Sequence, residues 1–408
     1  MPATLPKAAT ETLAGVRGKR IVLISHDLGQ TGSPLLLVET AVKLREVGAR
    51  VQLVTLGNDA RHKNNCAIRN HLEILDVALS FARCAQADLT IANTAAAWPW
   101  VDDYLRAYPQ AGRSLLWWIH EPATEAYVPH MDSLERGAAA LFDSYASLES
   151  WKLTGTNFPS LAEVIYPGVA DGFLQKAGNL CFPYPRNGIA GILMGRTRSL
   201  TRDEIRTALR IEANDFVLLS IGLASPLKGQ SLLMSTIRRT LSENPNLPIK
   251  VVLVGFLSTR AKKKFEGELA APVRQALRAF RTTQDLTPYY AAADALVMNS
   301  QGLGENFGRV TTEAMAFRLP VLGTDAGGTR EIIRHGVTGL LHPVGADGQR
   351  QLAENIMMLL NDRRKAKAMG EAGYSRVQEK FTSSRFDALF GALLERILTQ
   401  PPAHGDAP

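Results

Sequence analysis

The stretch that decides the fold runs from Gly304 to Gly328 and reads GENFGRVTTEAMAFRLPVLGTDAGG. Glu305 lies among glycines, which favour a loop, whereas Glu313 lies in a segment with the apolar spacing of a helix. The apolar run LPVLGT follows and predicts a strand, and a pair of glycines closes the stretch. A loop, a helix and a strand in this order are typical of an α/β domain.

Two carboxylates around a helix start predict a site for an elongated ligand. If the helix begins near Arg309, its first N–H groups and its dipole favour an anion at that end. Eight residues at about 1.5 Å each would separate Glu305 from Glu313 by up to about 12 Å. Carboxylates accept hydrogen bonds from hydroxyls, so the pattern suits a nucleoside diphosphate sugar. The alternative is an exposed helix residue at Glu313 and a capping carboxylate at Glu305.

The same alternation extends over the 408 residues. Apolar strands separated by helices are expected at residues 19–26, 50–57, 87–94, 114–121, 138–144, 215–222, 249–256, 293–300 and 318–324. Continuous apolar strands of this kind imply parallel sheets that are covered by helices on both faces. The fold class expected is therefore α/β, with two similar Rossmann-like units and a long helical segment near the C-terminus.

Clustered proline and glycine at about residues 166–195 indicate the boundary between the units. We expect a disordered tail (1–18), an N-terminal domain on the acceptor side (19–168), a linker (169–195), a C-terminal donor domain (196–380), and a helix that packs back toward the N-terminal domain before a final tail (381–408). Open parallel sheets bind ligands beyond the carboxyl ends of their strands. Two such sheets would face each other across an inter-domain cleft lined by residues that follow strands, Gly255 among them.

Composition narrows the class of protein. Hydrophobic residues make up 46% and charged residues 21% of the chain, as in soluble globular proteins. Cys66, Cys84 and Cys181 lack a C-x-x-C spacing, which favours a reducing cytoplasm over a disulfide framework or zinc cluster. No apolar run reaches the length of a membrane span.

The positive charge lies in the second half, which has 31 Lys and Arg against 22 Asp and Glu after residue 170. Its densest patch, RAKKKFEGE at residues 260–268, alternates with acids and predicts a solvated helix face. Scattered basic residues without a reading helix argue against a nucleic-acid partner.

The stretch GENFGRVTTE resembles the E-x7-E signature of the retaining glycosyltransferases of family 4, the group 1 transferases. The segments ISHDLGQTGSPLLLVETA, WWIHEPATEAYVP, VIYPGV and DLTPYYAAADALVMNS are also similar to this family, from about Ile21 to Arg376. The resemblance implies a GT-B fold, with the nucleotide-sugar donor held mainly by the C-terminal domain.

The resemblance also implies roles for individual residues. Glu305 would hold hydroxyls of the donor sugar, Glu313 the ribose, and Lys228 the diphosphate. His120 would lie near the donor sugar and the reaction centre, although a packed or capping histidine is the alternative. The remaining residues expected to bind the donor are Gly32, Ser33, Gly255, Asn306, Phe307, Gly308, Arg309, Val310 and Thr311.

One position departs from the family pattern. An arginine often stands five positions before the lysine, where this chain has Leu223. The leaving diphosphate therefore has one cation fewer in this loop. Either another cation replaces it, with Arg309 or a residue of the region from Arg196 to Arg206 as the candidates, or the donor is held differently.

Several neighbouring residues keep two interpretations. Glu121 is either near the site or an acid at a helix start ahead of Pro122. Gly327 and Gly328 either bring backbone amides to the ligand or open the next helix. At least one tryptophan of the pair at 117–118 is expected in the core, and the pair at 98 and 100 is a candidate lining of the acceptor side.

The expected activity is transfer of a sugar from a nucleotide diphosphate sugar to a saccharide or lipid-linked acceptor, with retained anomeric configuration. We expect no obligatory metal or cofactor, and a cytoplasmic protein with at most peripheral association at the inner membrane face. Two alternatives stay open: a nucleotide-sugar epimerase of the same architecture, and a non-catalytic nucleotide-sugar binder, which the loss of the arginine at Leu223 would favour.

Overall fold

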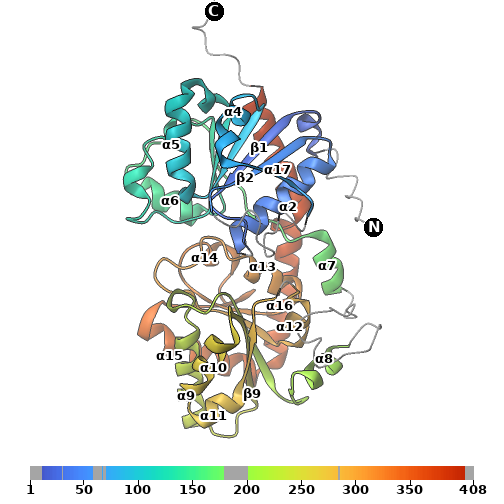
Figure 1. Cartoon of the computed structure of the whole chain (residues 1–408). Coiled ribbons are helices and arrows are strands. Elements are labelled where there is room, and N and C mark those ends of the chain that lie inside the picture. Colours follow the sequence, from blue (N-terminus) through green and yellow to red (C-terminus); the bar gives the residue numbers. More distant parts are fainter. Residues whose placement is uncertain are drawn as a thin grey trace, which may run out of the picture. The chain divides into compact units, whose positions relative to one another are not determined.

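The computed structural model describes residues 12–29, 31–57, 67, 70–178, 201–283 and 285–399. They divide into two compact units, Met1–Gly168 with Ser383–Pro408 (unit 1) and Val169–Thr382 (unit 2). Each unit contains one parallel β-sheet with helices packed on it (Figure 1). The expected pair of Rossmann-like units is therefore confirmed.

Unit 1 is built on seven parallel strands in the order β3-β2-β1-β4-β5-β6-β7. The strands are β1 (Arg20–Ser25), β2 (Arg50–Thr55), β3 (Glu73–Leu75), β4 (Leu89–Asn93), β5 (Leu115–Ile119), β6 (Ala139–Phe142) and β7 (Ala162–Val164). The chain order reverses between β1 and β4, and ligands of such sheets bind at this kind of switch point.

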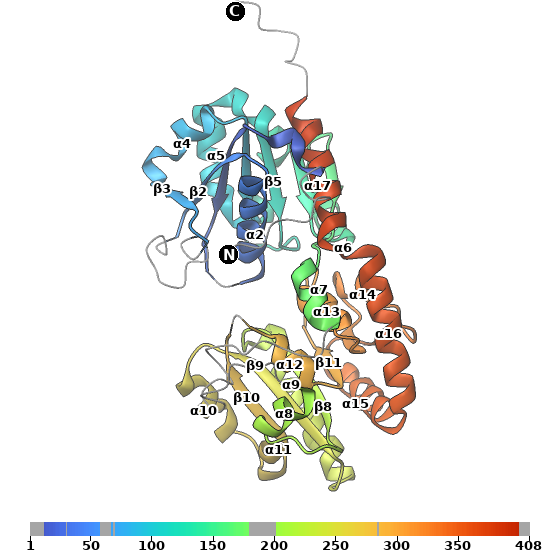
Figure 2. The same cartoon turned by 90° about the vertical axis from the view of Figure 1, so that its right-hand side faces the viewer.

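Alternate side chains of these strands enter two different cores. Leu23, Ile91 and Trp118 pack with α2 (Gly32–Glu46) and α17 (Ser383–Leu398). Figure 2 shows α17 along one side of unit 1. Ile24 and Trp117 pack on the other face with α4 (Val77–Ala85), α5 (Trp98–Ala107) and α6 (Tyr145–Lys152). Both tryptophans are fully buried, as expected for at least one of them.

The N-terminal segment corrects one expectation. Residues 12–18 are part of unit 1, because a short 3-10 helix (Ala14–Val16) packs on α17. Leu13 and Val16 are buried in the same core as Phe390, and Gly391 leaves room for the carbonyl of Thr12. A disordered tail over residues 1–18 is therefore wrong for residues 12–18, while residues 1–11 lie outside the described part.

Unit 2 is built on six parallel strands in the order β10-β9-β8-β11-β12-β13. The strands are β8 (Phe216–Ile221), β9 (Ile249–Phe256), β10 (Leu277–Arg281), β11 (Ala295–Met298), β12 (Val321–Thr324) and β13 (Gly339–His342). The order reverses between β8 and β11, which makes this the switch point of unit 2.

The helices of unit 2 complete its layers. One face of the sheet packs with α9 (Gln230–Glu243), α11 (Ala271–Ala276), α15 (Gly345–Asn361) and α16 (Arg363–Lys380). Near the switch point, α12 (Thr287–Ala292) contacts β8, and α13 (Arg309–Ala316) contacts β11 and β12. Unit 2 also contains α8 (Arg202–Ala208) and α14 (Thr329–Ile332).

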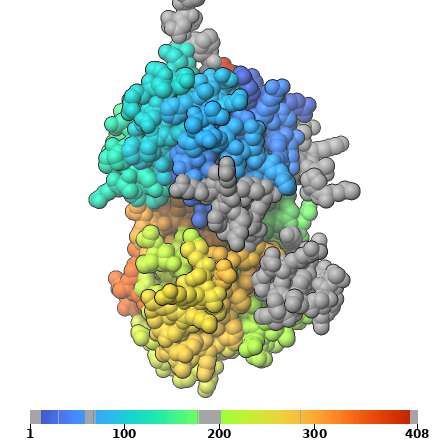
Figure 3. Space-filling model, viewed as in Figure 1, coloured from blue at the N-terminus to red at the C-terminus, as the bar shows by residue number. Residues whose placement is uncertain are grey.

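Two peripheral helices test further expectations. The basic patch forms α10 (Thr259–Gly267), which buries no residue and lies at the surface in the yellow region of Figure 3, so the expected solvated face is confirmed. The segment expected as a linker begins with α7 (Asp171–Gly178), whose Phe173 packs on aromatic rings of unit 2. Residues 179–195 of that segment lie outside the described part.

None of the helices described in the structure is both long and apolar enough to cross a membrane. Cys84 is buried and not in a disulfide, and burial raises the pKa of its thiol to about 12. Cys66 and Cys181 lie outside the described residues.

Candidate functional site

Three polar side chains converge at the switch point of unit 2. Lys228 ends a short 3-10 helix (Pro226–Lys228) that follows β8, while Ser300 and Glu305 follow β11. The ammonium group of Lys228 pairs with Oε1 of Glu305. The hydroxyl of Ser300 donates to the same oxygen at 2.5 Å. Two of the residues predicted from sequence, Lys228 and Glu305, are therefore in direct contact.

Glycines shape the loop that carries Glu305. Gly304 and Gly308 have φ angles of 80° and 97°, which only glycine adopts at little cost. A Cβ on Gly304 would lie 2.7 Å from the backbone of Ala326. The loop thus packs against the turn that follows β12. This close approach of the two backbones requires glycine, because a Cβ would clash.

Gly327 and Gly328 belong to this packing. The N–H of Gly328 donates to the carbonyl of Glu305 at 2.8 Å, and a Cβ on Gly327 would lie 2.2 Å from that carbonyl oxygen. The amide of Gly328 is therefore used to hold the Glu305 loop, and the pair also precedes α14. Of the two interpretations, the turn that opens the next helix is the one observed.

The Lys228 loop is fixed by contacts with the end of β11. The side-chain amide of Asn299 donates to the carbonyl of Gly229 at 2.9 Å, and Gly229 has a φ of 66°. Nε2 of His342 lies 3.0 Å from the Asn299 amide oxygen. Burial lowers the pKa of His342 to about 4, so its ring is neutral at pH 7. The position of Lys228 therefore depends on a neutral buried network.

Glu313 lies in α13, as predicted, and is held by a tyrosine. The hydroxyl of Tyr290 donates to Oε2 of Glu313 at 2.8 Å. The Tyr290 ring stacks on Phe317 and meets Phe173 edge-on. Burial, and then the charge of Glu313, raise the pKa of Tyr290 well above its ordinary value, so the phenol stays a hydrogen-bond donor.

The helix start at Arg309 agrees with the sequence expectation. Gly308 is the N-cap residue of α13, and no side chain caps this end. Among the expected donor-binding residues, the side chains of Phe307 and Thr311 are buried, so only their backbone can meet a ligand. Both polar atoms of the Asn306 side chain are buried without a hydrogen-bond partner among the described residues.

Gly255 was expected to follow a strand. In the structure it lies within β9. A Cβ at this position would lie 1.7 Å from the carbonyl oxygen of Gly222. The carbonyl of Gly255 accepts a hydrogen bond from the amide of Ala224 at 3.1 Å. Because Gly255 has no side chain, the backbone that leads to Lys228 can pass close to it, and the donor contact predicted for it stays a prediction.

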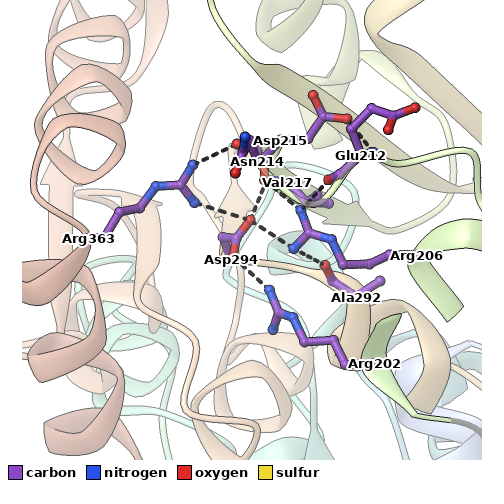
Figure 4. Close-up of polar contacts among 9 residues, drawn as sticks. All are labelled: Arg202, Arg206, Glu212, Asn214, Asp215, Val217, Ala292, Asp294 and Arg363. Carbon is purple, nitrogen blue, oxygen red and sulfur yellow. Dashed lines mark hydrogen bonds and ion pairs between the residues drawn. The ribbon is translucent and has the colours of Figure 1, made fainter. Parts of the chain in front are cut away.

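The arginines expected to replace the cation missing at Leu223 lie elsewhere. Arg202 and Arg206 surround Asp294, which also accepts from the amide of Val217 at 2.8 Å (Figure 4). Asp294 directly precedes β11, whereas Ser300 follows it, so the two groups lie at opposite ends of this strand. The expectation is wrong for these two arginines, and residues 196–200 lie outside the described part. Arg309 stays the candidate.

A second polar cluster lies at the carboxyl ends of β4, β5 and β6 in unit 1. His120 follows β5, and its side chain is 6% exposed. Nδ1 lies 2.6 Å from Oδ2 of Asp143, whose other oxygen accepts from the indole of Trp118. Nε2 lies 2.7 Å from the amide oxygen of Asn93. A ligand hydroxyl would have to displace Asn93 to reach a ring nitrogen of His120.

Strained backbone marks the same edge of unit 1. Thr94, directly after β4, has a φ of 76°, which is costly for a β-branched residue. Its hydroxyl contacts Nδ1 of His26 at 2.9 Å, and Oε2 of Glu121 accepts from the amide of Ala95 at 2.8 Å. Glu121 thus holds the turn after β4, rather than starting a helix ahead of Pro122. Burial raises the pKa of Glu121, and the contact with His26 lowers that of Asp27.

The other expectations for unit 1 need correction in detail. Gly32 and Ser33, which were expected to bind the donor, form the first turn of α2. Trp100 is buried, and its indole donates to the hydroxyl of Ser80, so it does not line an acceptor site. Trp98 stacks on the ring of His130 with centroids 4.0 Å apart.

Sequence reasoning missed Ser300 and Tyr290. Both lie in the segment that resembles the family, but a serine after a strand and a tyrosine in an apolar helix carry no signal of their own. Within the described ranges, no three His, Cys, Asp or Glu side chains are grouped so that they could hold a metal ion.

Comparison with known proteins adds to this geometry. The family described as "Glycosyl-transferase family 4" matches residues 17–165, and "Glycosyl transferases group 1" matches residues 201–376. The chain is 30% identical over 219 residues to a D-inositol 3-phosphate glycosyltransferase of Thermobispora bispora, a match that covers 51% of this chain and 50% of the relative. The chain thus spans about half the length of that curated relative.

Solved structures agree on the fold. Anabaena Alr3699/HepE in complex with UDP superposes with a TM-score of 0.74 at 20% identity, covering 91% of this chain and 98% of the other. Sucrose-phosphate synthase from Thermosynechococcus elongatus gives 0.70 at 20% identity, with coverage of 92% and 98%. The two parallel-sheet units are therefore those of the GT-B fold.

Proposed function

Because this chain belongs to the family 4, group 1 glycosyltransferases, we propose that it transfers a sugar from a nucleotide diphosphate sugar to an acceptor hydroxyl, with retention of anomeric configuration. The observation that carries the proposal is the meeting of Lys228 and Glu305 at the switch point of unit 2. A cation for phosphate and a carboxylate for hydroxyls lie side by side there, at the edge where open parallel sheets bind ligands.

The donor is assigned mainly to unit 2. Glu305 accepts hydrogen bonds from the sugar hydroxyls, and Glu313 accepts them from the ribose. The diphosphate lies between them, against Lys228 and the N-terminus of α13, with Arg309 at the first position of that helix. Uridine is the first base to test, because Alr3699/HepE was solved in complexes with UDP and with UDP-glucose.

Unit 1 would supply the acceptor side. The backbone at Gly32 and Ser33 begins α2, whose N-terminus favours an anion, and His120 follows β5 at the carboxyl edge of the same sheet. We assign His120 to the acceptor and donor sugar only together with a shift of Asn93, since both ring nitrogens are engaged in the structure.

For the chemical step we propose a front-face route. The bond from the anomeric carbon to the phosphate oxygen breaks, the bond to the acceptor oxygen forms on the same face, and the leaving phosphate takes the acceptor's proton. Lys228 and the dipole of α13 stabilise the charge that develops on the diphosphate. In this route the protein contributes by positioning the donor and acceptor and by stabilising the developing charge.

A thermal-shift screen over uridine, guanosine and adenosine diphosphate sugars tests the proposal. A ligand that binds only the folded state adds about 2.7 kcal/mol of stability at one hundred times its Kd, so the true donor should raise the Tm. Mass analysis of the selected donor with candidate acceptors should then show a glycosylated product. A new donor isomer without acceptor would indicate an epimerase, and binding without any turnover a non-catalytic binder.

Tyr290→Phe is expected to raise the KM for the donor about tenfold with kcat nearly unchanged. The change removes the hydrogen bond to Glu313, worth about 1.5 kcal/mol for a charged acceptor, but keeps the ring between Phe173 and Phe317. A contact with the ribose stabilises the bound ground state and the transition state equally. Its loss therefore raises KM and leaves kcat unchanged.

Steady-state kinetics with the selected donor and with its 2′- and 3′-deoxyribose analogues checks this result. The penalty should disappear with the analogue that lacks the hydroxyl bound by Glu313. An equal penalty with every analogue would contradict the assignment of Glu313 to the ribose. Tyr289→Phe, a neighbouring buried tyrosine that packs on Phe280, is the matched control.

A further inference from the structure

The two oxygens of Glu305 have different surroundings. Oε1 accepts from both Ser300 and Lys228. Oε2 has no hydrogen-bond or ion-pair partner among the residues that the structure describes, although the Glu305 side chain is only 16% exposed. One oxygen is therefore anchored to the protein, and the other is left for a ligand.

The two anchors differ in how firmly they are held. Ser300 is 2% exposed and lies two residues after β11, so its hydroxyl is fixed by the sheet. Lys228 is a flexible side chain with 35% exposure. An ammonium group moves readily toward a stronger anion, and a diphosphate carries more negative charge than one carboxylate. When donor binds, the contact of Lys228 with Glu305 is the one that weakens.

We propose that Ser300 is a positioning residue that keeps the Glu305 carboxylate oriented while Lys228 turns to the diphosphate, so that Oε2 faces the hydroxyls of the donor sugar. This inference rests on the proposed function. Without Ser300, Lys228 is the single anchor of Oε1, and donor binding forces it to serve either the carboxylate or the phosphate. The effect of losing Ser300 therefore depends on whether the ligand carries a sugar. A nucleoside diphosphate alone needs only Lys228, whereas the complete donor needs Lys228 and the Glu305 carboxylate in place at the same time.

The test compares Ser300→Ala with the wild-type protein, using UDP-glucose and UDP or the matched pair that the screen selects. A lost hydrogen bond to a charged group corresponds to about a tenfold to hundredfold loss. We expect kcat/KM for transfer, and the affinity for the complete donor, to fall within that range. The affinity for the nucleoside diphosphate should change less than about threefold.

Two further variants separate positioning from folding. Ser300→Thr keeps the hydroxyl and should restore most of the transfer rate. Thr240→Val removes another buried hydroxyl of unit 2, one that bonds within α9 to the carbonyl of Thr236, and should lower the Tm without a loss that depends on the sugar.

Each result decides the matter. Equal losses for the donor and for the nucleoside diphosphate would show a merely structural serine, and an unchanged Ser300→Ala protein would show no role; either overturns the inference and leaves the proposed function intact. A wild-type protein that binds no nucleotide sugar would overturn both. A sugar-dependent loss that threonine restores supports the inference.

Discussion

Replacing Glu305 by glutamine is expected to lower kcat/KM for sugar transfer by about 10²- to 10³-fold, the usual effect of removing one preorganised electrostatic contact at a reaction centre. The carboxylate accepts from Ser300 and Lys228 on one oxygen and offers the other to the donor sugar. An amide keeps the shape but loses the charge. If its N–H group faces Lys228 or Ser300, it also places donor against donor.

The measurement is steady-state transfer with the donor chosen by the thermal-shift screen. Glu371→Gln is the matched control, because Glu371 also pairs with a cation of unit 2, Arg318, at 3.0 Å, but on the surface of α16. Surface pairs contribute about 0–1 kcal/mol, so this control should be close to wild type in rate and stability. A Glu305→Gln protein that transfers sugar at more than about a third of the wild-type rate would contradict the role given to Glu305.

The sequence predicted the architecture because its signals are local. Continuous apolar strands between helices indicate parallel sheets, and the glycines around Glu305 and the pattern that follows Arg309 indicate a loop and a helix start. All three features are found in the structure. The roles of Lys228 and Glu305 at one donor site came instead from the resemblance to the family, and the two side chains are in contact in the structure.

What the sequence could not show are contacts between side chains from different strands and helices. Nothing local connects Ser300 with Oε1 of Glu305, or Tyr290 with Glu313. The same reason explains the wrong position expected for Arg202 and Arg206, since an arginine serves equally well for a phosphate or a buried carboxylate. Only the fold shows that α8 directs both toward Asp294.

The sequence also could not show where the ordered part of unit 1 begins. Residues 12–18 contain two glycines and one arginine, which favour a tail, yet Leu13 and Val16 are buried against α17, some 380 positions later in the chain. Whether such a segment is ordered depends on a distant apolar surface. Local composition carries no information about that surface.

Removing the carboxylate of Asp294 is expected to destabilise unit 2 by about 3 kcal/mol, the lower end of the cost of breaking a buried ion pair. Asp294 accepts from Arg202 at 2.7 Å and from Arg206 at 3.4 Å, and it lies 3.6 Å from Arg363 (Figure 4). Arg206 is 7% exposed, so Asp294→Ala removes the carboxylate that pairs with its buried guanidinium. Solvent reaches Arg202 and Arg363, which keeps the cost at that lower end.

The network holds together parts of unit 2 that are distant in sequence. Arg206 also donates to the carbonyl of Asp215 at 2.5 Å, ahead of β8, and Asp294 accepts from the amide of Val217 within β8. The carboxylate thus pairs with three cations and accepts a backbone hydrogen bond near the start of β8. Asp294→Asn keeps an acceptor for that amide and loses only the charge, so it should cost less than Asp294→Ala.

Thermal or urea unfolding of the full chain measures the effect, followed on the transition that bound donor shifts. For a unit of this size, 3 kcal/mol corresponds to a fall in Tm of about 6–12 °C. Asp325→Ala is the control, since Asp325 pairs with Arg330 at 3.7 Å with both side chains more than half exposed, and it should change stability by no more than about 0.5 kcal/mol. If Asp294→Ala were no less stable than this control, the three arginines would not depend on Asp294, and the buried guanidinium of Arg206 would be satisfied by its backbone carbonyls alone.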